Sequence, residues 1–253
     1  MSVVERIIRE YKPDNIAARV KLAGQRSYTV ETSKNRLQFD ISHRIAKTWF
    51  GTRCADGPHE PNMADTFESA VSRGEVVFDV GSHLGFYSVL ASACNAGEIH
   101  AFDLDQHRLR ITGSHPTDVP PSLVCAAIAS ESGRCVGYSP RQSGRRSTTQ
   151  ATRAKRGEQS LATISLDDYC TSNDVSPDVV KMDIEGGEVD ALRGFEHTLA
   201  TSPPEHVLVE IHRELLRDRG EDPDWVEEFL AEHGYRINTI PGENERIHAV
   251  LSS

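Results

Sequence analysis

Short apolar runs of strand length alternate with segments of helix length along most of the chain. The clearest run covers residues 76–80, with the sequence VVFDV, and is typical of a strand buried on both faces. Comparable runs predict strands at residues 98–104, 122–129, 178–184 and 206–211. Between them, the spacing of apolar residues predicts helices at residues 65–71, 86–96, 105–112, 189–199 and 224–233, the fourth interrupted at Gly194. This alternation predicts an α/β protein with a mostly parallel sheet.

The C-terminal part of the chain departs from this alternation. Residues 235–240 and 246–251 have the pattern of two strands, and the Pro-Gly sequence between them is typical of a turn. We therefore expect an antiparallel hairpin to close the sheet. Further upstream, residues 163–169 predict a short strand followed by a turn.

The N-terminal residues form a separate pattern. Two short helical pieces broken at Pro13 are followed by a hairpin that pairs residues 28–30 with 37–41. We expect a small N-terminal α/β extension at residues 1–60, which covers an edge or a pocket, and a main domain at residues 61–253.

A glycine-containing turn follows the first apolar run. Gly81 and Gly85 stand in the pattern G-x-x-x-G, with Ser82 and His83 between them, directly before the helix at residues 86–96. A strand, a glycine turn and a helix open the nucleotide-binding α/β sheets, because glycine admits a ligand and the helix N-terminus offers free N–H groups. The middle glycine that admits a pyrophosphate in G-x-G-x-x-G is absent. This favours an adenosyl ligand without phosphates, of which S-adenosylmethionine (SAM) is the common one.

Acidic residues close four of the predicted strands. They are Asp79, Asp103, Asp183 with Glu185, and Glu210, which is followed by His212. Asp103 lies 22 residues after Gly81, near the distance at which an acid holds the hydroxyl groups of a ribose. Because ligands of such sheets bind beyond the carboxyl ends of the strands, the four acidic ends favour a polar cleft there. Ala127, in the third strand, would leave room for a flat base.

Composition limits the partners. The formal net charge is −10, with 38% hydrophobic and 26% charged residues, which is typical of a soluble globular protein and disfavours nucleic-acid binding through a basic surface. Residues 139–160 are the exception, with six Arg and Lys residues against one Glu. We expect a mobile loop there, either simply solvated or acting as a lid or clamp for an anionic substrate.

The remaining compositional signals concern the compartment. None of the five cysteines forms a C-x-x-C pair, so neither a zinc site nor a redox pair is indicated. No apolar stretch approaches the 18 residues of a membrane span, and the charged N-terminus has no signal-peptide pattern. These features predict a cytoplasmic protein with reduced thiols.

Several of these segments together resemble the FkbM family of SAM-dependent methyltransferases, which mostly methylate hydroxyl oxygens. They are FDVGSHLGFYS at 78–88, AFDLD at 101–105, AIASESG at 127–133, SLDDY at 165–169, KMDIEGGEVDALRG at 181–194 and VEIH at 209–212. The K-x-D-x-E-G-x-E block within the fifth segment is the most specific. The chain departs from the family pattern at His83, at Asp103, where Glu is usual, and at Ser130, where an acid is common.

The resemblance implies a class I (Rossmann-like) methyltransferase fold, with a seven-stranded sheet and SAM as the cofactor. The cofactor-binding residues it implies are Asp79, Gly81, Ser82, His83, Gly85, Asp103, Leu104 and Ala127. For the acceptor, a small molecule or a glycan, we expect Asp183, Glu185 and His212 to be catalytic, with His212 the better base near neutral pH. Lys181 is expected to form a structural ion pair.

Other interpretations of these residues remain open. Asp183, Glu210 and His212 could hold Mg²⁺ or Mn²⁺, although their spacing alone does not establish a metal site and we expect none. An NAD-dependent oxidoreductase or epimerase would share Asp103 but lacks its glycine pattern and a Tyr-x-x-x-Lys pair. A non-catalytic adenosyl-binding module, or an RNA methyltransferase that binds through residues 139–160, are the remaining alternatives.

Overall fold

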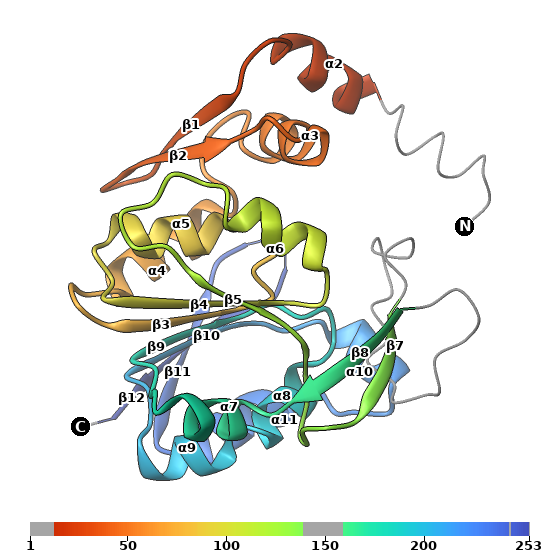
Figure 1. The fold of residues 1–253 in the computed structure, drawn as a ribbon. Helices are drawn as coiled ribbons and strands as arrows, with labels where there is room; N and C mark the ends of the chain where they lie inside the picture. The colour runs from red at the N-terminus through yellow and green to blue at the C-terminus, as the bar shows by residue number, and fades with distance from the viewer. Residues whose placement is uncertain (1–12, 139–158, 243, 253) are drawn as a thin grey trace.

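A seven-stranded sheet forms the centre of the computed structural model, which describes residues 13–138, 159–242 and 244–252 (Figure 1). Its strands lie in the order β11-β12-β10-β9-β3-β4-β5. Their bounds are β3 Val76–Val80, β4 Glu98–Asp103, β5 Ser122–Cys125, β9 Val179–Met182, β10 His206–Glu210, β11 Tyr235–Ile240 and β12 Arg246–Leu251. The five neighbouring strands β10, β9, β3, β4 and β5 are parallel to one another. Strand β12 lies between β10 and β11 and is antiparallel to both. The predicted class I methyltransferase fold is thereby confirmed.

The strand order places a topological switch point beside β3. The chain passes from β3 to β4 and β5 on one side, then returns to β9 and β10 on the other. Parallel α/β sheets bind their ligands at the carboxyl ends of the strands near such a point. The ends of β3, β4, β9 and β10 are the four that carry the acidic residues.

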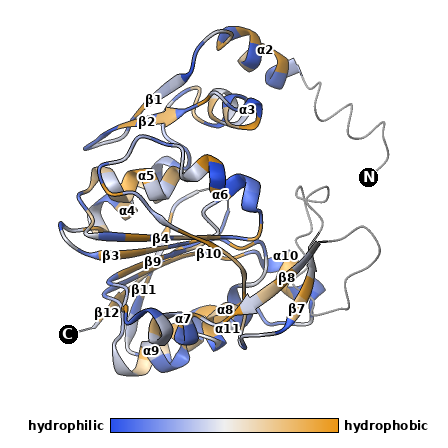
Figure 2. Ribbon diagram, viewed as in Figure 1, coloured by the Kyte–Doolittle hydropathy of each residue, from blue (hydrophilic) through white to orange (hydrophobic). Residues whose placement is uncertain are grey.

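Alternation along the strands separates two hydrophobic cores. Val77 joins the core on one face of the sheet, whereas Phe78 and Val80 join the core on the other. Helices α4 (Pro61–Ala70), α5 (Phe86–Ala93) and α6 (Gln106–Thr112) cover the first face (Figure 1). The second face is covered by α7 (Leu166–Asn173), α8 (Glu188–Arg193), α9 (Glu196–Thr201) and α11 (Trp225–Glu232), while α10 (Arg213–Asp218) follows β10. Figure 2 shows hydrophobic residues along the central strands and hydrophilic ones over much of α6.

The N-terminal region packs on α5 rather than forming a core of its own. It consists of α2 (Pro13–Lys21), the hairpin of β1 (Ser27–Glu31) and β2 (Arg36–Asp40), and α3 (Arg44–Arg53). Phe39 stacks on Phe50 at 4.2 Å between ring centroids and on Phe86 of α5 at 5.8 Å. The predicted hairpin is therefore present, and it covers the helix that follows the glycine turn. The division of the chain at residue 60 stays a prediction.

The structure corrects two predicted elements. The expected strand at residues 122–129 is broken at residue 126 into β5 and β6 (Ala127–Ile128), and β6 leaves the large sheet. It pairs instead with β8 (Gln159–Ile164) in a three-stranded sheet that also contains β7 (Cys135–Tyr138). The expected turn after the strand at residue 163 is the helix α7, which Ser165 caps by accepting a hydrogen bond from the Asp168 N–H.

The basic loop expected at residues 139–160 lies almost entirely outside the described residues. The first predicted helical piece, before Pro13, lies outside them as well.

Candidate active site at the carboxyl ends of the central strands

The glycine turn after β3 is held against the end of β4. The N–H groups of Gly81 and Ser82 both donate to the Phe102 carbonyl oxygen at 2.9 Å. Gly81 has a φ of +84°, and a Cβ added there would lie 1.9 Å from the carbonyl oxygen of Asp183, at the end of β9. Glycine is thus required because two strand ends approach each other closely. Gly85 is the N-cap of α5 and has a φ of +80°, with no room for a Cβ beside Thr112.

Asp103 ends β4 with its carboxylate directed at the turn. The His83 N–H donates to Oδ2 at 2.9 Å, and the Asp105 N–H donates to Oδ1 at 2.7 Å. Burial raises the pKa of Asp103 to about 6, although Arg108 and the two N–H donors act in the opposite direction. Each oxygen keeps acceptor capacity, so the group can take hydroxyl donors beside the glycine turn.

Asp79 is buried completely beneath the turn. Its Oδ2 accepts a hydrogen bond from Ser88 of α5 at 2.7 Å, and its Oδ1 lies 3.7 Å from the Lys181 Nζ. The Lys181 Nζ is also 3.7 Å from Asp183 Oδ2, so one buried ammonium joins two strand ends, as expected of a structural ion pair. Burial raises the pKa of Asp79, and Lys181 opposes this only in part.

Two buried polar atoms near the turn make no hydrogen bond within the described part of the chain. They are Asp79 Oδ1 and Ser82 Oγ. Buried polar atoms are nearly always paired, so such atoms are candidates for contact with a bound molecule or water. Their position fits a polar ligand lying over the glycine turn.

The other cofactor-binding residues expected from the sequence are placed less directly. Leu104 follows Asp103 and is partly buried, and its carbonyl oxygen accepts a hydrogen bond from Cys125 Sγ at 3.8 Å. Ala127 is fully buried in β6, where it pairs with Thr163. A role for Ala127 beside a flat base stays a prediction.

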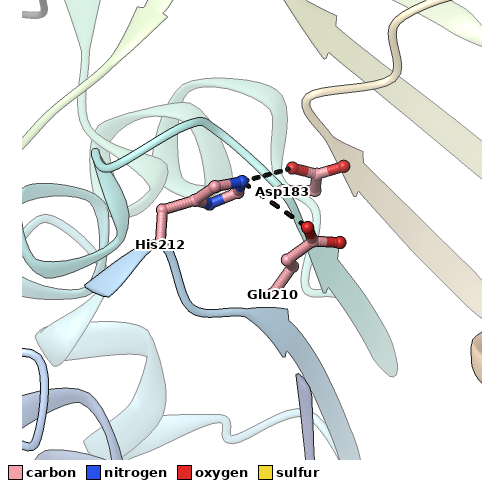
Figure 3. A group of neighbouring side chains, drawn as sticks. All are labelled: Asp183, Glu210 and His212. Atoms are coloured by element: carbon pink, nitrogen blue, oxygen red, sulfur yellow. Dashed lines mark ion pairs between the residues drawn. The ribbon is translucent and has the colours of Figure 1, made fainter. Parts of the chain in front are cut away.

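His212, two residues after the end of β10, lies among carboxylates. Its Nδ1 lies 2.8 Å from Oε1 of the fully buried Glu188, which also accepts from the Gly186 N–H at 2.9 Å. Its Nε2 lies 3.7 Å from Asp183 Oδ1, 3.6 Å from Glu210 Oε1 and 3.7 Å from Glu185 Oε2. Figure 3 shows this nitrogen directed at Asp183 and Glu210. The three predicted catalytic residues are therefore brought together.

These charges change the expected protonation of His212. Burial lowers its pKa, but the hydrogen bond to Glu188 and the charges of Glu188, Asp183 and Glu185 outweigh this effect and raise the pKa to about 9. The ring by itself is then protonated near neutral pH. This revises the expectation that His212 is the better free base there.

Glu185 differs from its neighbours in backbone and exposure. Its φ is +54°, a left-handed conformation that is uncommon for a residue with a side chain, and its side chain is 58% exposed. Burial raises its pKa, and Asp183, Glu210 and Glu188 add to this, while His212 opposes it. Glu60 and His83 share the positive φ, and backbone strain of this kind concentrates at functional sites.

A comparison with known families settles the identity of this arrangement. The family model described as "Methyltransferase FkbM domain" matches residues 79–237, which is more than half of the chain. The chain belongs to the FkbM methyltransferase family. The match begins at Asp79 and includes the whole set of strand ends described above.

Known relatives of this FkbM family member include one curated protein and several solved structures. Hexuronic acid methyltransferase AglP from Haloferax volcanii is 29% identical over an alignment of 163 residues that covers 62% of this chain and 62% of AglP. The alignment thus spans less than two thirds of that protein. Methyltransferase FkbM from Methylobacillus flagellatus is 15% identical, with a TM-score of 0.45 over 97% of this chain and 60% of its own. An O-methyltransferase from Bacillus cereus in complex with SAH is 13% identical, with a TM-score of 0.44 over 75% of this chain and 79% of its own.

Residues from the N-terminal region also reach the FkbM site. The sequence predicted that this region covers an edge or a pocket, but not which residues make the contact. Glu60 accepts hydrogen bonds from Arg246 of β12 at 2.6 Å and from the Tyr87 hydroxyl at 3.1 Å. The Trp49 ring lies 4.8 Å from the ring of His59 and 5.3 Å from that of His83. These contacts link a segment before the family match to the glycine turn.

Glu188 is a further residue of the site to which the sequence analysis gave no role. It is the last acid of the K-x-D-x-E-G-x-E block, so the motif itself contained the signal.

None of the helices in the described part of the chain combines the length and the hydrophobicity that a membrane span needs.

Proposed function

We propose that this chain is a SAM-dependent methyltransferase that methylates an oxygen atom of a sugar, a glycolipid precursor or a small metabolite. The observation that carries the proposal is the connection between Asp103 and the glycine turn through the His83 N–H. It places a buried carboxylate beside a turn whose helix begins at Gly85, as a nucleoside site requires. Family membership supports methyl transfer, and the similarity to AglP, a hexuronic acid methyltransferase, makes a hexuronic acid the first acceptor to test.

The residues of the turn suit the parts of SAM. Asp103 would accept the ribose hydroxyls, because its two backbone donors leave acceptor capacity on both oxygens. Ser82 Oγ, which makes no hydrogen bond within the described residues, and Asp79 Oδ1, which makes only the ion pair with Lys181, fit the polar methionine end. When bound, SAM supplies a methyl group on a positively charged sulfur with a good leaving group.

The chain's own contribution to the chemistry is mainly position. Holding an acceptor in line with the bond to be broken can supply about 7–11 kcal/mol of the barrier. A hydroxyl acceptor must also lose its proton. We assign the role of the base that accepts this proton to Glu185. Its carboxylate is the exposed one of the group and is not fixed by a hydrogen bond to a buried cation. A positioned base adds about 10²–10⁴-fold.

The direct test is incubation of the full chain with methyl-labelled SAM and oligosaccharides that end in glucuronic or galacturonic acid, with the neutral glucose and galactose oligosaccharides as controls. We expect label in the uronic acid products. Treatment with mild base then separates the two possible oxygens, since a methyl ester releases methanol and a methyl ether does not. Saturable binding of SAM with no transfer to any hydroxylated acceptor, including a lysate of the source organism, would favour a non-catalytic adenosyl-binding module.

A further inference from the structure

Three side chains that commonly bind metal ions converge beside the proposed methyl-transfer site. Asp183, Glu210 and His212 each offer one ligand atom, and these atoms lie within 4.8 Å of one another. They come from the ends of neighbouring strands, with Asp183 after β9 and the other two at the end of β10 (Figure 3). The main chain of the two strands therefore fixes their spacing.

The distances around His212 Nε2 fit an ion better than a hydrogen bond. This nitrogen lies 3.6 Å from Glu210 Oε1 and 3.7 Å from Asp183 Oδ1, and it makes no hydrogen bond within the described ranges. Ligand atoms about 2.1 Å from a common divalent ion, at angles of 90–120°, lie about 3.0–3.6 Å apart. The three ligand atoms lie within 4.8 Å of one another, so a shift of about 1 Å would close them around one ion.

The opposite end of each side chain is already held. Glu188, fully buried, accepts from His212 Nδ1–H because a carboxylate can only accept, so Nε2 is the nitrogen that can bind the cation, which displaces its proton. Asp183 Oδ2 faces Lys181, and Glu210 Oε2 accepts from Arg246 at 2.8 Å. Metal-binding histidines and carboxylates are typically oriented in this way by a second layer of partners.

We propose that Asp183, Glu210 and His212 Nε2 bind one divalent cation, with Glu188 as the positioning residue of the histidine. One imidazole with two carboxylates suits Mn²⁺ or Mg²⁺, and the absence of thiolates from the set disfavours softer sites. The role of this cation in catalysis rests on the proposed function, since its remaining coordination positions would hold the acceptor hydroxyl.

The cation would assist the deprotonation of the acceptor hydroxyl and would leave the overall methyl-transfer reaction the same. An ion at this place polarises the acceptor oxygen and lowers the pKa of its hydroxyl. The O–H bond breaks and the proton passes to Glu185. The oxygen electron pair forms the bond to the methyl carbon, and the C–S bond breaks with its electron pair left on the sulfur of S-adenosylhomocysteine (SAH).

Mn²⁺ alone tests the site without any reaction. The full chain, treated with EDTA and desalted, is titrated with Mn²⁺ and the free ion is followed by electron paramagnetic resonance. We expect one ion per chain, with at least tenfold weaker binding for His212→Ala and for Asp183→Asn. Glu188→Gln should weaken binding by about 10- to 100-fold. The exposed His197, on α9, supplies the matched control, and His197→Ala should bind Mn²⁺ like the wild type.

A measurement on the unaltered protein covers the case in which the variants do not fold. Pulsed resonance spectra of bound Mn²⁺ should show coupling to an imidazole nitrogen. No binding, unchanged binding in His212→Ala, or bound Mn²⁺ without nitrogen coupling would each overturn the site. Mn²⁺ binding with nitrogen coupling but no methyl transfer to any acceptor would support the site and reject the proposed function.

Discussion

Replacing Gly81 by alanine tests the close approach that builds the site. The added Cβ would lie 1.9 Å from the Asp183 carbonyl oxygen, whereas real contacts of this kind stay above about 3.0 Å, so β3 and β9 must separate by about 1 Å at their ends. That movement strains the hydrogen bonds from Gly81 and Ser82 to Phe102 and from Asp183 to Val80. Losing one or two of them costs about 1–3 kcal/mol, and alanine at positive φ adds about 1–2 kcal/mol.

Gly133 provides a control with the same backbone conformation. Its φ is +83°, against +84° for Gly81, but nothing lies within 4 Å of the position of its Cβ. We expect Gly133→Ala to lose only about 1–2 kcal/mol of unfolding free energy and Gly81→Ala about 2–5 kcal/mol, measured by urea denaturation. SAH affinity should fall at least tenfold in Gly81→Ala alone. Equal losses of stability in the two variants would refute the reasoning.

Three further predictions concern charged residues of the site. Because the pKa of Asp103 is raised to about 6, its carboxylate gains a proton as the pH falls through that value, so SAH should bind more weakly below pH 6. In Asp103→Asn, calorimetry should show weaker binding at pH 8 and little pH dependence, and an unchanged profile would contradict the assignment. Lys181→Met should destabilise the fold by about 3–5 kcal/mol, because it leaves Asp79 and Asp183 without their cation, and Asp79→Asn should restore part of the loss in thermal unfolding. Asp183→Asn and His212→Ala should slow turnover far more than they weaken SAH binding, and wild-type rates in both would remove these residues from the reaction.

The sequence was sufficient for the sheet and for the acidic strand ends. Strands buried on both faces give mostly apolar runs, so β3, β9 and β10 were recognisable, and the acids at or near their ends, Asp79, Asp183 and Glu210, could be placed at one edge. The break at residue 126 carries no glycine or proline signal. It follows instead from the pairing of β6 with β8, a contact between distant parts of the chain.

The electrostatic environment of the site could not be predicted from the sequence, unlike the strands and their terminal acids. His212 was expected to be a base because an isolated imidazole titrates near neutral pH. Its environment is set by Glu188 on α8 and by Asp183 and Glu185 after β9, which meet only in the folded chain. The contact of Glu60 with Arg246 joins residues that are distant in sequence, so no local sequence pattern predicts it.

The most direct test of the account is a calorimetric titration of the purified chain with SAH, repeated with Asp103→Ala and with NAD as the competing ligand. We predict one SAH site per chain, at least tenfold weaker binding in Asp103→Ala, and no heat with NAD. Heat with NAD but none with SAH, or SAH affinity that does not depend on Asp103, would contradict the claim that the turn after β3 and the end of β4 hold the methyl donor.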